Sequence, residues 1–150
     1  MQGLVQKFDV RVINFFRRWE ITISRIAIFV VYFWFGLLKF IGMSPATPLV
    51  QILSEKTINF MPFGIFYILF SFFEVVIGVL FLIRGLERIA IVLLGFHLAT
   101  TILPLFFMPQ LTWQAFLVPT LEGQYIIKNI LIIACAVVVG SKIVPKSSVN

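Results

Sequence analysis

The chain has 150 residues, of which 61% are hydrophobic and 12% are charged, and its formal net charge is +6. Because soluble domains carry about 25% charged residues, this composition excludes a soluble globular protein and predicts a single membrane domain over residues 1–150. The single cysteine, Cys135, excludes an internal disulfide and a cysteine-rich metal site.

Residues 4–19 predict an amphipathic helix that lies on the membrane surface. Its apolar face consists of Val5, Phe8, Val12, Phe15, Phe16 and Trp19. The basic side chains expected to contact anionic lipid headgroups are Lys7, Arg11, Arg17 and Arg18. The basic residues fit a membrane surface better than a nucleic acid, because they cluster at the membrane flanks rather than in one patch. The alternative is a basic tail that is helical only near the membrane.

Four apolar stretches are each long enough, at about 1.5 Å per residue, to cross a hydrocarbon core of about 30 Å. They cover residues 21–42, 63–83, 89–108 and 124–144. The first contains Arg25 and Lys39, whose long side chains can reach toward opposite membrane surfaces. A cleaved signal peptide is the rival interpretation of this first stretch, but Pro45 within its small-residue site disfavours it.

The connections predict how these helices follow one another. The Arg84–Arg88 segment is a tight turn, so the third helix should be antiparallel to the second. A short helix is expected over Leu49–Ile58, and Pro104 should kink the third helix near its end. Trp113 and Phe116 should anchor the next loop at the membrane interface. The predicted fold is therefore all-α, an antiparallel four-transmembrane-helix bundle preceded by an amphipathic interfacial helix.

The basic residues also predict which side of the membrane is cytoplasmic. With four spans, the N-terminal segment, the Arg84–Arg88 turn and the C-terminal tail share one side, and they hold most of the Lys and Arg residues. The opposite connections hold only Lys56 clear of the membrane. By the positive-inside rule, both termini are expected in the cytoplasm.

Glu74 lies near the middle of the 63–83 stretch, where an ionised side chain costs about 2.5 kcal/mol or more unless it has a partner. Tyr67, Ser71 and Gly78 share its helical face and form a polar, small-residue stripe with it. His97, in the third helix, lies at the same expected depth, about 16 Å below the outer surface. Glu74 and His97 are therefore predicted neighbours, with Thr101 on the same face as His97.

A second group of polar residues is expected about 5 Å below the outer surface. It consists of Lys39, Lys128, Asn129 and Glu122. Only Glu122 at the edge and Glu74 deeper down can pair with the two lysines. Two buried ammonium groups repel one another, so an anion or a polar headgroup between them would be stabilising. This surplus of cations predicts a small-molecule pocket in the outer half of the bundle, with Lys39, Glu74, His97 and Lys128 on its wall. The alternative is that both lysines point outward and aromatic side chains, Tyr32 among them, close the gap.

The buried polar residues also have purely structural interpretations. Glu74 can be protonated, or it can bond to His97, Tyr32 or Ser71 and so hold helices together. His97 beside Glu74 could act as a proton site or as a hydrogen-bond donor to a quinone. A single histidine and few carboxylates argue against haem or a two-metal centre, so no metal site is predicted.

Three blocks resemble the DoxX-like membrane proteins, a family that includes the DoxD and RclC types. These blocks are RIAIFVVYFWFGLLKF (Arg25–Phe40), FEVVIGVLFLI (Phe73–Ile83) and EGQYIIKN (Glu122–Asn129). The resemblance covers about residues 20–142 in order. It implies a four-helix bundle in the bacterial cytoplasmic (inner) membrane, association with redox and stress-defence systems, and Lys39, Glu74 and Lys128 as recurring polar residues.

Two functional hypotheses follow from these residues and this resemblance. The first is an accessory or scaffold subunit of a respiratory, redox or stress-defence membrane complex, without catalytic activity of its own. The second is an oxidoreductase subunit that exchanges electrons or protons with quinone, the one cofactor considered, near Glu74 and His97. A transporter is a weaker third idea, because four spans leave little room for alternating access. The expected partners are the lipid bilayer and either other membrane subunits or further copies of the chain.

Overall fold

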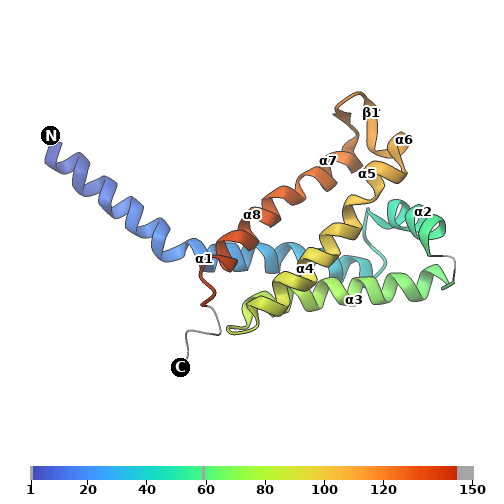
Figure 1. Ribbon diagram of the computed structural model, residues 1–150, viewed down its shortest axis with the longest axis horizontal. Coiled ribbons are helices and arrows are strands. Elements are labelled where there is room, and N and C mark those ends of the chain that lie inside the picture. The colour runs from blue at the N-terminus through green and yellow to red at the C-terminus, as the bar shows by residue number, and fades with distance from the viewer. Residues whose placement is uncertain (1, 59, 145–150) are drawn as a thin grey trace.

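The computed structural model of the protein describes residues 2–58 and 60–144. This part of the chain is mostly helical, and four helical segments are long and apolar enough to cross a membrane (Figure 1). They are Val5–Phe40, Phe63–Leu82, Glu87–Phe107 and Leu121–Gly140. The expectation of four membrane-length helices is therefore confirmed.

The first helix, α1 (Gln2–Phe40), is continuous over 39 residues. It joins the predicted 4–19 and 21–42 helices without a break, because neither glycine nor proline separates them. Its length is about 58 Å, nearly twice the thickness of a hydrocarbon core, so only part of it can cross a membrane. Figure 1 shows that its N-terminal half extends away from the other helices. Packing begins near Glu20, which pairs with Lys142 at 3.0 Å.

The remaining spans lie close to their predicted positions. The second, α3 (Phe63–Leu82), ends one residue before the predicted boundary. The third comprises α4 (Glu87–Ile102) and α5 (Pro104–Phe107), with an interruption beside Pro104, where a kink was expected. The fourth comprises α7 (Leu121–Ile127) and α8 (Asn129–Gly140), which meet at Lys128.

The two longer connections contain their own secondary structure. The first holds α2 (Thr47–Thr57), which confirms the short helix expected there. The second holds α6 (Pro109–Thr112), β1 (Trp113–Ala115) and β2 (Val118–Pro119), where only a loop was predicted. The two strands pair antiparallel. Their turn contains Leu117 at a φ of 59°, a left-handed conformation for which the sequence carries no glycine or asparagine signal.

Helix α1 packs most extensively against α3 (Figure 1). Two glycines let these backbones approach closely. A Cβ atom at Gly36 would lie 3.0 Å from the carbonyl oxygen of Ser71, and one at Gly78 would lie 2.9 Å from the backbone nitrogen of Phe33. The polar stripe of α3 faces this contact, since Tyr67, Ser71, Glu74 and Gly78 are all buried, as predicted.

The apolar core joins α1, α3, α4 and α8. Its buried members include Ile28, Ile77, Phe81, Leu94 and Val139. Large apolar side chains elsewhere on the spans are exposed, among them Val92, Phe96 and Phe106. An apolar exterior around an apolar core is typical of helices that face lipid.

Candidate functional site

Glu74 is the centre of a buried polar cluster. It lies on the inward face of α3 and is 5% exposed. The Lys39 ammonium donates to both of its carboxylate oxygens, at 2.7 Å and 2.6 Å. Lys39, near the end of α1, is itself 8% exposed. Each charge therefore offsets the cost of burying the other, which would be several kcal/mol for a lone ion.

His97 extends this cluster from α4. Its Nε2 atom lies 3.1 Å from Glu74 Oε1, and its Nδ1 atom lies 3.0 Å from the Tyr32 hydroxyl. A neutral histidine protonated on Nε2 satisfies every group, because Nε2–H donates to Glu74 and Nδ1 accepts from Tyr32. An imidazolium would instead donate from both nitrogens, so the Tyr32 hydroxyl would then have to accept from Nδ1.

Aromatic rings cover the cluster. The Phe70 ring stacks on His97 with centroids 5.1 Å apart and an interplanar angle of 20°. The Lys39 Nζ atom lies 5.6 Å from the centre of the same Phe70 ring, and Phe73 lies at 6.2 Å from His97. These rings exclude water, and exclusion of water strengthens the ionic and hydrogen-bonded contacts inside.

The four residues form a closed path between three helices, called here the polar chain (Lys39, Glu74, His97 and Tyr32). The path leaves α1 at Lys39, passes through Glu74 on α3 and His97 on α4, and returns to α1 at Tyr32. Tyr32 and Lys39 are about two helical turns apart, so they share a face of α1. The polar chain therefore ties three membrane-length helices together.

The predicted proximity of Glu74 and His97 is confirmed. Lys39 was expected near Lys128, with Glu74 and Glu122 as the carboxylates able to pair with the two lysines. Its ammonium bonds to Glu74, whereas Lys128 does not join this cluster. The four-carbon stem of lysine is long enough to carry the charge inward along the helix, and the buried carboxylate draws it there.

The rest of the expected outer group does not assemble. Lys128 and Glu122 are exposed and Asn129 is half-buried. The Lys128 ammonium lies 5.4 Å from the centre of the Tyr125 ring, without a contact to the polar chain. Helix α7 buries Gly123, where a Cβ atom would lie only 2.1 Å from the carbonyl oxygen of Thr112, and the neighbouring Glu122 is exposed.

Two expected supporting residues bond to their own helices rather than to the polar chain. The Ser71 hydroxyl is fully buried and donates to the carbonyl oxygen of Tyr67 at 2.6 Å. The Thr101 hydroxyl donates to the carbonyl oxygen of Leu98 at 3.0 Å. A contact that the sequence did not predict joins α2 to α3, because Thr47 Oγ1 lies 2.6 Å from the Tyr67 hydroxyl.

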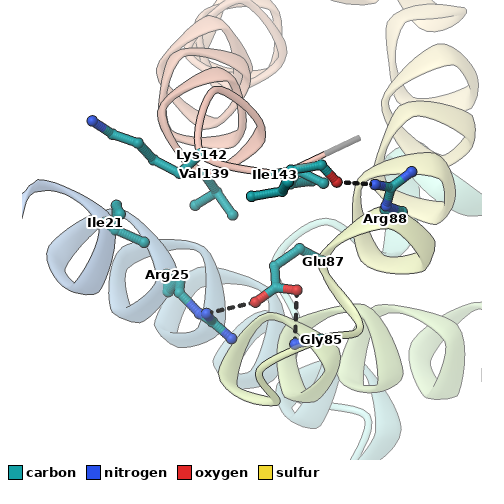
Figure 2. A pocket seen from close by; sticks show the side chains of 9 residues that line it. Ile21, Arg25, Gly85, Glu87, Arg88, Val139, Lys142 and Ile143 are labelled. Atoms are coloured by element: carbon teal, nitrogen blue, oxygen red, sulfur yellow. Dashed lines mark hydrogen bonds and ion pairs between the residues drawn. The ribbon is translucent and has the colours of Figure 1, made fainter. Parts of the chain in front are cut away.

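A second polar cluster lies near the turn between α3 and α4 (Figure 2). Arg25 donates to Glu87 at 2.8 Å and to the carbonyl oxygen of Phe81 at 2.5 Å. Glu87 also accepts from the Gly85 backbone nitrogen at 2.8 Å. The sequence predicts for Arg25 only a side chain that reaches toward the membrane surface. The signal for this contact is Glu87, the one acidic residue of the Arg84–Arg88 turn, because that turn is expected on the same side of the membrane as Arg25.

A cavity of about 350 Å³ adjoins this second cluster. It contains none of Lys39, Glu74, His97 and Lys128, so it is not the expected outer pocket, which stays a prediction.

Within residues 2–58 and 60–144, no group of three or more His, Cys, Asp or Glu side chains is placed to hold a metal ion. Comparisons with family models, with curated proteins and with solved structures give no match.

Proposed function

We propose that the protein is an accessory or scaffold subunit of a redox, respiratory or stress-defence complex in the bacterial inner membrane. The observation that carries this proposal is the closed polar chain. Both oxygens of Glu74 are occupied by Lys39, and both ring nitrogens of His97 are occupied by Glu74 and Tyr32. Groups that satisfy one another stabilise a helix assembly, whereas a ligand site needs polar groups directed at the ligand.

The arrangement proposed for the chain is an antiparallel bundle of four spans with both termini in the cytoplasm. The concentration of basic residues at the N-terminal segment and at the Arg84–Arg88 turn supports this topology. The resemblance to DoxX-like proteins, in the blocks around Lys39, Glu74 and Lys128, supports the redox or stress-defence context. This support from the resemblance does not depend on the contacts of the polar chain.

The N-terminal half of α1 is proposed to lie on the cytoplasmic membrane surface. Phe8 and Phe16 are 70% and 62% exposed there, which is unfavourable in water. Arg11 and Arg18 lie beside this apolar face. An anionic leaflet would bury the first pair and attract the second. Other subunits, or further copies of the chain, would then pack on the exposed faces of the spans.

A quinone-linked oxidoreductase subunit is the second candidate function. The observation that favours it is the order of groups in the polar chain, where Tyr32, His97 and Glu74 are each able to donate or accept a proton. This reading requires a quinone pocket in the outer half of the bundle, next to that chain.

Affinity purification from membranes in a gentle detergent distinguishes these functions. Subunits are identified by mass spectrometry, and quinone is extracted and quantified from the same sample. Stoichiometric membrane subunits without quinone support the scaffold, and stoichiometric quinone without partner subunits supports the oxidoreductase. A folded protein with neither would contradict both.

A further inference from the structure

We propose that the cavity beside the turn between α3 and α4 binds a phosphate ester, with the headgroup of an anionic phospholipid as its natural form. Figure 2 shows this cavity between α1, that turn and the end of α8. Its polar lining is formed by Arg25, Glu87, Arg88 and Lys142. Its apolar lining includes Ile21, Val139, Ile143 and Val144.

The cavity lies where lipid headgroups are found. Gly85 belongs to the connection between two membrane-length helices, and Glu87 is the first residue of the second of them, so both lie at the end of a span, where a membrane surface is expected. The fourth span ends at Gly140, and Lys142 and Ile143 come just after its cap residue, Ser141. Basic pockets between helices at this level are a common form of binding site for anionic lipid headgroups.

The charges at the cavity leave a positive surplus. Among the described residues that line the cavity, Arg25, Arg88 and Lys142 carry positive charge and Glu87 alone carries negative charge; Glu20, outside the lining, pairs with Lys142. Glu87 is occupied by Arg25 and by the Gly85 backbone nitrogen. Figure 2 shows its carboxylate held toward these two groups. A phosphate would therefore meet the cations with little competition from this carboxylate.

The basic side chains retain donors for an anion. Arg88 donates one hydrogen bond to the carbonyl oxygen of Val144, and a guanidinium has five N–H groups. Lys142 pairs with Glu20 at 3.0 Å but remains 55% exposed, so its ammonium can move toward a headgroup. The Arg25 Nη2 atom is buried and has no hydrogen-bond partner in the part of the chain that the structure describes.

The volume and the apolar wall favour a lipid over a free ion. About 350 Å³ matches small-molecule sites and is far larger than inorganic phosphate requires. Ile21, Val139 and Ile143 would contact the glycerol and the first methylenes of the acyl chains. The competing explanation is that Arg25 and Glu87 only fasten α1 to the turn, and that the space beside them binds nothing.

Lipid retention by the whole protein tests the proposal. Wild type, Arg88→Gln, Lys142→Gln and the double variant are purified in detergent, mixed with phosphatidylglycerol or phosphatidylcholine, and examined by native mass spectrometry. We expect selective retention of phosphatidylglycerol, weakened about fivefold for each cation removed. Arg84→Gln is the matched control, because Arg84 is exposed in the same turn and does not line the cavity.

The outcomes separate the two sources of phosphate and the competing explanation. A rise in melting temperature with inorganic phosphate alone, lost in the same variants, would support the phosphate site but assign it to a free ion. Equal retention of both lipids, or equal loss in Arg84→Gln and Arg88→Gln, would overturn the proposal. Both lining substitutions replace exposed side chains, so folding should persist. If the lipid measurement contradicts this proposal, the subunit composition measured by affinity purification is unaffected and still tests the proposed function separately.

Discussion

Lys39 and Glu74 neutralise one another inside the helices, with the ammonium within 2.7 Å of both carboxylate oxygens. The two residues are far apart in the sequence and lie on different membrane-length helices. Because a buried ion without a partner is strongly unfavourable, the position of α1 along α3 is coupled to this contact. The pair therefore sets the register between the two helices that pack most closely.

The hydroxyl of Tyr32 should contribute to stability through its contact with His97. Tyr32→Phe removes the hydroxyl and leaves His97 Nδ1 buried without a partner, so we expect a loss of about 1–3 kcal/mol in unfolding free energy. Denaturation of the detergent-solubilised protein measures this loss. Tyr125→Phe is the matched control, since Tyr125 is 68% exposed. Equal stability of the two variants would show that the Tyr32 contact is unimportant.

The close approach of α1 and α3 should depend on their glycines. Gly78→Ala places a Cβ atom 2.9 Å from the Phe33 backbone nitrogen, so the helices must separate, and we expect a lower melting temperature. Gly95→Ala in α4 is the control, because nothing lies within 4 Å of its Cβ position. Alanine favours a helix over glycine by about 1 kcal/mol, so that variant should be neutral or more stable. A more stable Gly78→Ala would argue against the packing.

The topology predicts which positions an impermeant maleimide can label in intact cells. In a Cys135→Ser background, Phe116→Cys in the hairpin should react, because Phe116 is 91% exposed and the hairpin is expected outside the cytoplasm. Gln6→Cys in the N-terminal half of α1 should react only after the cells are broken. Labelling of Gln6→Cys in intact cells would reverse the proposed orientation.

The sequence predicted the spans and one contact of the candidate site well. Uninterrupted apolar stretches fix where membrane-length helices lie, and α3 begins at Phe63 as expected. The inward stripe around Glu74 followed from helical periodicity. The short turn between α3 and α4 placed His97 at the depth of Glu74, and the two are 3.1 Å apart.

Other features depend on information that periodicity does not contain. Depth along a helix locates a Cα atom, but Lys39 carries its charge several ångströms away on a flexible stem, so depth alone does not decide which carboxylate it meets. The exposure of Glu122 on α7 depends on how tightly Gly123 packs against Thr112. The hairpin near Trp113 lacks the usual turn residues, since Leu117 adopts the positive φ.

A double-mutant cycle on Lys39 and Glu74 tests the central claim, that the polar chain is a structural tie between helices. Glu74→Gln leaves the Lys39 charge buried alone, and Lys39→Met leaves the Glu74 charge alone, so each should cost about 3–5 kcal/mol. The double variant removes both charges and keeps an amide oxygen for His97, so it should recover most of that loss. Reversible unfolding in detergent gives the four stabilities. A double variant as unstable as the sum of the single ones would contradict the tie.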